Sequence, residues 1–593
     1  QTLRWRNISS RPATELQFHL YWNAWRNRES TWMRERRFVT GYTPPRDDAW
    51  GSIDIDAIRI RRADGTVIDL TGEIRFVAPD DGNTADRTVM TVPSPESIAP
   101  NGIADIEIDW RARIPRPFAR TGYIGDYYFI AQWFPKIGVL EDDGWNAHQF
   151  HAVSEFYADF GVYDVAITVP RDFVVGASGR ETERTDNGDG TATVRYHGED
   201  IHDFAWTASP RFIDVRRPFQ HPALNRVEMR LLLQPEHAGQ EHRHFDAAAA
   251  TLRYFGEWFG SYPYDHLTIV DPAYQSGSGG MEYPTLITAG TRWLAPRAIT
   301  VPESVTIHEA AHQWWYGVVA TNEFEAAWMD EGLTMFGEPR VTEEMDEANR
   351  LGIRFFGGFI PWVIDDIRLR RETNGNRLPT YRLAAEADAP ATPTFRYWPA
   401  SATPISYDKT ALWLHTLERH LGWPVVQQIL STYFDRWKFR HPEPAHLFAI
   451  ANEVTGSDLS WFFDQVYGGS NTFDYAVQEL VSERAGEGPY VTTVVAQRLG
   501  EGTFPVDVVT TFEDGRQVRE HWDGRNRRVM YVYDRPSRAR TAQIDPQRVL
   551  LLDVNYTNNS RTLAPRAGEA SLKWSLKWMG WLQDLMLTYA FFA

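Results

Sequence analysis

The sequence predicts a multidomain α+β protein in which two β regions flank a mainly helical region and an amphipathic helix ends the chain. Apolar and polar residues alternate with period two up to about residue 215, as at Ile106, Ile108 and Trp110. Helical periodicity then dominates to about residue 466, and alternation returns after Gly468. Period two is typical of half-buried strands, whereas a period near 3.6 indicates amphipathic helices. The order of these patterns gives the order of the predicted domains.

These patterns divide the chain into four parts. Residues 1–215 are predicted to form a β-sandwich domain, and residues 216–466 a mostly helical domain. Residues 467–556 are predicted to form a small β-sandwich of about five short strands. A linker and a C-terminal amphipathic helix are expected over residues 557–593.

The composition limits the chemistry of this chain. Of its 593 residues, 43% are hydrophobic and 24% are charged, which is ordinary for a protein that buries large cores. The formal net charge is −18, and an acidic chain lacks the basic surface that nucleic-acid binding requires. The chain has 0 cysteines, which excludes disulfides, a cysteine nucleophile and thiolate metal ligands. Any metal site must therefore be built from His, Asp and Glu.

Both ends of the chain favour a location outside the cytoplasm. The chain starts at Gln1 rather than Met, and a cleaved export signal is one explanation. In the tail, Trp574, Trp578 and Trp581 have helical spacing, with lysines on another face. Two interpretations of residues 572–592 stay open, namely a helix at a membrane surface and a helix packed on its own protein. We expect an exported protein that is periplasmic or associated with a membrane.

The sequence contains one H-E-x-x-H motif, made by His308, Glu309 and His312. A helix is predicted over Val301–Val319, and positions i and i+4 of a helix share one face, so both imidazoles can reach one metal ion. Glu309 lies beside them and can act as a general base toward water. The alternative is a buried, hydrogen-bonded histidine pair without a metal.

Two further glutamates extend this candidate site. Catalytic metal sites of this kind use three protein ligands, and Glu331 follows His312 by 19 positions. Glu338 comes seven residues later, on the same helix face, where it can orient a ligand imidazole. The alternative for Glu338 is an ordinary solvated side chain. The motif with Glu331 predicts a hydrolytic metal centre.

Three motifs in order resemble those of one peptidase family. H-E-x-x-H, 18 intervening residues and Glu331 resemble the zinc signature of the gluzincins. Upstream, Gly279–Pro284 reads G-G-M-E-Y-P, similar to the G-x-M-E-N-P motif of the M1 aminopeptidases in a bacterial-type variant. Downstream, Tyr407–Lys409 resembles the start of their Y-x-K-G motif. The resemblance spans about residues 245–466, and the chain is identified as a member of the M1 family.

This resemblance implies a fold and a set of catalytic residues. A β-sandwich saddle would cover a thermolysin-like catalytic domain, with the active site between them. His308, His312 and Glu331 would hold one Zn²⁺ per chain. Glu309 would be the general base, and Tyr407 would donate a hydrogen bond to the oxyanion.

The same resemblance implies a peptide-binding strand. Glu282 would bind the free α-amino group of the substrate by a charge-assisted hydrogen bond. Gly279, Gly280 and Met281 would run beside the peptide, and the two glycines would allow close approach. The expected partner is a peptide and not a nucleic acid, and the tail over 572–592 is a candidate for peripheral membrane contact.

Several positions depart from the family pattern. Tyr283 replaces the usual Asn, and Thr410 replaces the usual Gly after Lys409. An expected second anchor for the substrate amine falls on Phe134, with Gln132 or Glu155 as candidate replacements.

The predicted function is therefore that of an M1-like zinc aminopeptidase, with two alternatives. One is a zinc endopeptidase or another zinc hydrolase on the same site. The other is a non-catalytic, peptidase-like binding scaffold, because a fold does not fix a function.

Overall fold

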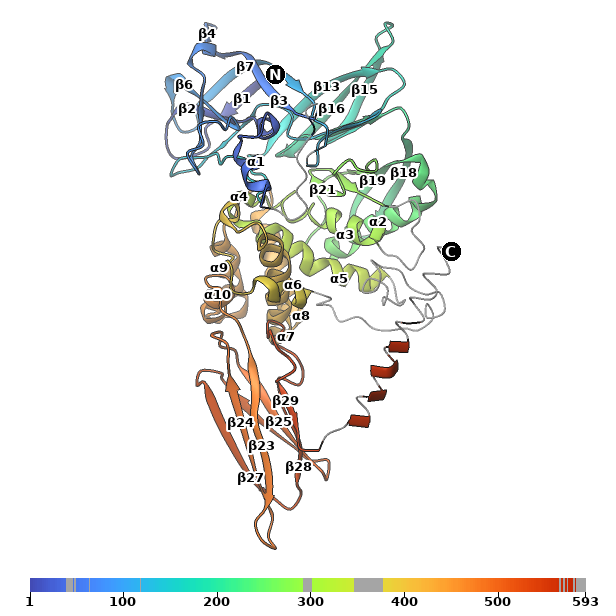
Figure 1. Ribbon diagram of the computed structural model, residues 1–593. Coiled ribbons are helices and arrows are strands. Elements are labelled where there is room, and N and C mark those ends of the chain that lie inside the picture. Colours follow the sequence, from blue (N-terminus) through green and yellow to red (C-terminus); the bar gives the residue numbers. More distant parts are fainter. Residues whose placement is uncertain are drawn as a thin grey trace.

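The computed structural model describes residues 1–593 except 39–45, 47–48, 63, 118, 292–300, 346–376, 565–566, 569–570, 573, 577, 580–581 and 583–593. Three folded parts follow one another along the chain, as predicted (Figure 1). A β-rich part lies at one end, a mainly helical part in the middle and a second β-rich part at the other end.

The N-terminal part consists of antiparallel sheets around two apolar cores. The first pair of sheets has the orders β1-β7-β3-β4 and β10-β2-β6-β5. Smaller sheets follow, with the orders β11-β12, β13-β16-β15 and β14-β17-β9-β8. The strands are β1 Thr2–Arg6, β2 Ala13–His19, β3 Ser52–Arg61, β4 Val67–Asp69, β5 Arg75–Val77, β6 Val89–Ile98, β7 Ile103–Arg113, β8 Gly122–Ile124, β9 Tyr127–Ile130, β10 Lys136–Ile137, β11 Val139–Leu140, β12 Trp145–Asn146, β13 Gly161–Pro170, β14 Val174–Ala177, β15 Arg180–Asp186, β16 Thr191–Ile201 and β17 Trp206–Ser209.

Strand β7 shows why this region folds as a sandwich. Ala104, Ile106 and Ile108 are buried, whereas Glu107 between them faces outward and pairs with Arg61. Since side chains alternate between the two faces of a strand, one face of β7 enters the core. The predicted period-two pattern is confirmed there.

The middle part begins with a five-stranded sheet of order β18-β19-β20-β22-β21. Its strands are β18 Ile213–His221, β19 Leu224–Leu233, β20 His266–Val270, β21 Gly280–Tyr283 and β22 Leu286–Ala289. The predicted boundary at residue 215 falls inside β18. Helices α2 Glu241–Trp258 and α3 Val301–Ala311 pack on each other and against β19 and β22. Strand β21 lies at the edge of this sheet.

The other helices of the middle part lie near the centre of the molecule (Figure 1). They are α4 Glu323–Ala326, α5 Leu333–Met345, α6 Arg377–Ala384, α7 Thr410–Leu421, α8 Trp423–Trp437, α9 Pro444–Thr455 and α10 Ser460–Val466. The prediction of one helix over 301–319 is wrong beyond Ala311. Tyr316 has a left-handed φ of 88°, and Val319 bridges to Arg440 instead of continuing the helix.

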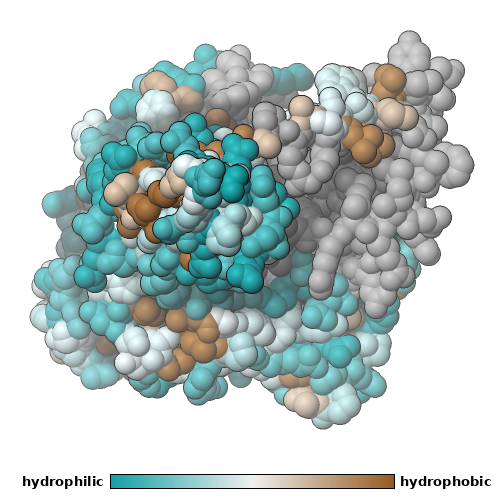
Figure 2. Space-filling view, turned by 90° about the horizontal axis from the view of Figure 1, so that it is seen from below, coloured by the Kyte–Doolittle hydropathy of each residue, from teal (hydrophilic) through white to brown (hydrophobic). Residues whose placement is uncertain are grey.

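The C-terminal part is a sandwich of two antiparallel sheets, β23-β24-β27 and β26-β25-β28-β29. Its strands are β23 Tyr475–Arg484, β24 Tyr490–Arg498, β25 Val506–Phe512, β26 Gln517–Trp522, β27 Arg528–Arg535, β28 Ala539–Ile544 and β29 Ser560–Thr562. The described residues thus hold seven strands here rather than about five, and β29 lies beyond the predicted end at 556. Seen from below, hydrophilic residues cover most of this end, with small apolar patches among them (Figure 2).

The predicted tail helix over 572–592 lies mostly outside the described residues. Leu572, Trp574 and Trp578 are described, and each is exposed in a segment drawn apart from the folded body (Figure 1). Within the described residues, no helix has the length and apolar character needed to cross a membrane. Membrane contact of the tail therefore stays a prediction.

Candidate metal centre

The end of α3 brings the two histidines of the motif together. The Nε2 atoms of His308 and His312 lie 3.1 Å apart. Oε2 of Glu331 lies 3.3 Å from Nε2 of His308 and 3.4 Å from Nε2 of His312. Three residues that sequence spacing singled out as ligands therefore converge on one point.

Two π-helical turns carry the third ligand candidate and the candidate catalytic tyrosine. Glu331 lies on the turn Trp328–Gly332 and Tyr407 on the turn Pro404–Lys409. Such turns often occur at functional sites because they re-aim side chains within a helix. A Cβ atom on Gly332 would lie 2.1 Å from Cγ2 of Thr410, so only glycine lets the two turns approach this closely. Gly332, which follows the third ligand candidate Glu331, thus lets the turns that carry Glu331 and Tyr407 pack against each other.

The three converging side chains fit a divalent metal ion. A tetrahedral ion with ligand distances of about 2.0–2.2 Å would hold its ligand atoms roughly 3.3 Å apart. The observed separations of 3.1–3.4 Å match that spacing. Oε2 of Glu331 is also buried without a hydrogen-bond partner, so it has a lone pair to offer. Two imidazole nitrogens and one carboxylate oxygen are ordinary donors for such an ion.

The charges around this point favour a cation. Burial lowers the pKa of His308, but Glu331 and Glu338 outweigh it and raise this pKa to about 10. Burial likewise lowers the pKa of His312, and Glu282 and Glu331 raise it to about 10. For Glu331 itself, burial opposes ionisation, yet the two imidazoles hold its pKa well below the usual range. The carboxylates thus attract positive charge, which a metal ion can supply in place of protons.

Carboxylates lie behind both imidazole rings, and the one behind His312 is within hydrogen-bond distance. Nδ1 of His312 lies 2.5 Å from Oδ1 of Asp330 and 3.2 Å from Oγ1 of Thr334. Nδ1 of His308 lies 3.6 Å from Oε2 of Glu338, where the sequence placed an orienting carboxylate. The contact of Asp330 with His312 selects the tautomer that leaves Nε2 of His312 free to bind a metal.

The candidate general base lies against the edge strand. A Cβ atom on Gly280 would lie 2.2 Å from Oε1 of Glu309, so the glycine makes room for this carboxylate. Burial raises the pKa of Glu309 to about 8, despite the opposing effect of His308. Glu282 lies beside it, with ligand atoms of Glu282, Glu309 and His312 all within 4.8 Å of one another. The side chain of Met281 is 2% exposed, so only its backbone can meet a substrate.

Tyr407 reaches the centre from the turn Pro404–Lys409. Its hydroxyl donates a hydrogen bond to Oε1 of Glu331, and its ring stacks on His308 with centroids 6.3 Å apart. Burial raises the pKa of Tyr407 well above its ordinary value, and Glu331 adds to this effect. The phenol therefore keeps its proton and can act as a donor.

A cavity of about 320 Å³ opens beside Glu331 and Tyr407 and reaches the N-terminal part. Its wall includes an ion pair between Arg120 and Glu155 that the sequence reasoning missed. Gln132 also lines the cavity, but its amide binds Asp203 and Lys136. Phe134 packs against Trp133 and Tyr163 in the N-terminal core. Both suggested replacements for the second amine anchor are therefore already engaged by other side chains.

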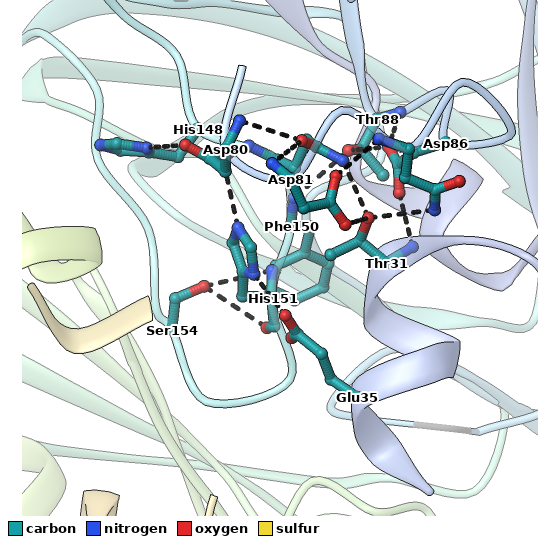
Figure 3. A network of polar contacts seen from close by, with 12 residues as sticks. Thr31, Glu35, Asp80, Asp81, Asp86, Thr88, His148, Phe150, His151 and Ser154 are labelled. Carbon is teal, nitrogen blue, oxygen red and sulfur yellow. Dashed lines mark hydrogen bonds and ion pairs between the residues drawn. The ribbon is translucent and has the colours of Figure 1, made fainter. Parts of the chain in front are cut away.

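A polar network holds the wall of this cavity (Figure 3). Asp80 accepts from Nδ1 of His148 at 2.6 Å and contacts Nε2 of His151 at 3.0 Å. Nδ1 of His151 lies 2.7 Å from Oε1 of Glu35 on α1 Thr31–Arg36. Burial lowers the pKa of His151, but Asp80 and Glu35 outweigh it and raise this pKa to about 9. The charged imidazole fixes the segment 150–156, most of which lines the cavity.

A family model matches the part of the chain that holds this site. Residues 243–466 match the family model described as the peptidase family M1 domain. The chain carries an M1 peptidase domain. The matched range contains every ligand candidate as well as Tyr407, so the predicted site lies inside the matched domain.

Relatives and a solved structure extend the comparison. Aminopeptidase 2 of Candida albicans is 25% identical over 245 residues, covering 40% of this chain and 25% of its own length. A leukotriene A-4 hydrolase homolog of Botryotinia fuckeliana is 25% identical over 183 residues, covering 30% of this chain and 26% of its own. The chain thus spans about a quarter of the curated relatives it matches.

The fold of most of the chain is similar to that of a solved aminopeptidase. Legionella pneumophila aminopeptidase A, in complex with aspartic acid, aligns with a TM-score of 0.60 at 12% identity. The alignment covers 86% of this chain and 56% of the other. The order of a β-rich part, a middle part that contains the M1 match and a second β-rich part therefore has a counterpart in a solved structure.

Proposed function

We propose that this protein is a zinc-dependent aminopeptidase that releases N-terminal residues from peptides. The observation that carries the proposal is the convergence of His308, His312 and Glu331 beside Glu309 and Tyr407 within an M1 domain. The donor set of two imidazoles and a carboxylate suits zinc. Zinc bound there would polarise the scissile carbonyl and lower the pKa of the attacking water. The relatives named as aminopeptidases support the exopeptidase assignment.

The side chains divide the remaining work. Glu309 takes a proton from the attacking water and passes it to the nitrogen of the leaving amine. Tyr407, which keeps its proton, donates a hydrogen bond to the oxygen that gains negative charge in the transition state. The hydroxyl donates to the ligand candidate Glu331, so it lies next to the proposed metal position.

The substrate lies along the edge strand in this proposal. β21 is the last strand of its sheet, so its outer backbone groups can pair with an extended peptide. Glu282 on this strand faces the metal ligands and binds the substrate α-ammonium group. A peptide in this register presents its first peptide bond to Glu309.

The Glu282→Gln variant tests this role. We expect KM for an aminoacyl p-nitroanilide to rise about 10- to 100-fold, because a buried hydrogen bond between charged groups is lost. Zinc affinity, measured by competition with a chelator, should stay unchanged because Glu282 is not one of the three ligands. Kinetics within twofold of the parent protein would show that the amine is bound elsewhere.

A further inference from the structure

Strand β27 is an exposed edge of the C-terminal sandwich. It lies at the end of its sheet and pairs with β24 on one side. Within the described residues, no strand pairs with its other side. Its ladder with β24 keeps one register over its whole length, and the strand contains no proline. The backbone groups on the outer side therefore form a regular template for another strand.

The outer face of β27 is apolar at its centre. Met530 is 63% exposed and Val532 is 56% exposed. Val491 on β24 lies on the same face, because its cross-strand partner Asp534 is an even number of residues from both. The edge strand of the other sheet, β26, reads Q-V-R-E-H-W and is mostly polar instead. Edge strands are usually protected by charges, prolines or bulges, so an apolar edge of this length indicates a partner strand.

Charges flank this apolar centre in a self-complementary order. Arg528 lies at one end of the strand and Asp534 near the other, and both side chains are exposed. No ion pair joins either of them to a described residue of its own chain. If two copies of β27 pair antiparallel about Tyr531, Met530 of one copy lies opposite Val532 of the other. In the same register, Arg528 of each copy lies opposite Asp534 of the other.

Neighbouring registers lack this match. With Met530 on the twofold axis, Arg528 would lie opposite Val532, and with Val532 on the axis, Asp534 would lie opposite Met530. Either shift therefore places a charge against an apolar side chain. Only the register centred on Tyr531 pairs apolar with apolar residues and opposite charges with each other.

We propose that β27 pairs with β27 of a second copy of this chain in a symmetric dimer. The two sheets β23-β24-β27 then form one continuous sheet, and its apolar centre is buried between two ion pairs. The C-terminal part lies at the opposite end of the molecule from the N-terminal part (Figure 1). The dimer thus leaves the cavity beside Tyr407, which reaches the N-terminal part, open to a substrate. This inference does not rest on the proposed function.

The interface is small, so the dimer should dissociate on dilution. A single pair of strands lies at the low end of specific interfaces, and we expect a Kd of about 1–100 µM. Sedimentation velocity of the full chain over a concentration series should show an equilibrium of monomer and dimer. A monomer throughout the series, or larger assemblies that grow with concentration, would overturn the proposal, since a twofold contact closes at two copies. No peptide is needed, so failure of the aminopeptidase assignment would leave this result unaffected.

Charge reversal tests the two ion pairs. In Asp534→Arg, arginines face each other at both ends of the interface, and we expect Kd to rise at least about 30-fold. The double variant Arg528→Asp with Asp534→Arg restores opposite charges, and Kd should return to within about fivefold of the parent value. The matched control is Glu513→Arg, the same change of charge in the exposed turn between β25 and β26. A dimer that persists unchanged in Asp534→Arg would overturn the proposal and assign the contact to another surface.

The register has its own chemical test, because the chain has 0 cysteines. Directly opposite residues of antiparallel strands have Cα atoms about 4.5–5.5 Å apart, which a disulfide can bridge. A mixture of the Met530→Cys and Val532→Cys variants should therefore form a disulfide-linked dimer when diamide oxidises the two thiols. Either variant alone should give much less, because its two thiols are offset along the strands. Equal yields from the mixture and from each variant alone, read on a non-reducing gel, would overturn this register.

Discussion

The Glu309→Gln variant is expected to lose peptide hydrolysis while keeping its metal. General acid–base catalysis contributes about 10²–10⁴-fold, so we expect kcat to fall by that order. The amide fits the space left by Gly280 but accepts no proton at neutral pH. KM should change little, because Glu309 is not proposed to bind the peptide. Initial rates on a defined peptide, with zinc content measured in the same sample, give the comparison.

The zinc measurement is the control for this variant. His308, His312 and Glu331 remain in place, so one ion per chain should be retained. Loss of zinc together with activity would mean that Glu309 supports the metal rather than the water. Full turnover by Glu309→Gln would refute the proposed mechanism.

The Tyr407→Phe variant is expected to show the second largest effect. Removing one donor to a developing oxyanion lowers kcat about 10²–10³-fold in other hydrolases, and we expect the same range here. The ring would still stack on His308, so the site should keep its shape. Steady-state kinetics should show a fall in kcat with KM nearly unchanged.

A fall in zinc affinity would instead mean that Tyr407 supports the metal site and not the oxyanion. Its hydroxyl donates to Glu331, so it could serve only to orient that carboxylate. In that case zinc affinity would fall while kcat at saturating zinc would recover. The two roles are separated by measuring rates over a range of free zinc concentrations.

Local patterns predicted most of the fold and the centre of the site. The change from period two to 3.6 and back gave the order of the three folded parts. His308 and His312 share one helix face, and this made the metal pair visible from sequence alone. Glu331 was singled out by its spacing from the motif and Tyr407 through the resemblance, and the structure brings both of them to the same point.

The missed features depend on contacts between distant segments. Arg120 meets Glu155 across 35 positions, which no local pattern encodes. The early end of α3 reflects the bridge from Val319 to Arg440. Asp330 had one usable signal, since a carboxylate next to a ligand glutamate is well placed to contact a ligand imidazole. Export and membrane contact of the tail remain predictions from the sequence.

The most direct test of the account compares one hexapeptide with a free N-terminus and the same peptide after N-acetylation. Zinc-loaded protein would be incubated with each, and products read by mass spectrometry, with Glu309→Gln as the inactive control. We predict stepwise loss of N-terminal residues from the free peptide and no cleavage of the acetylated one. Internal cuts in both peptides would contradict the aminopeptidase and assign the same zinc centre to an endopeptidase.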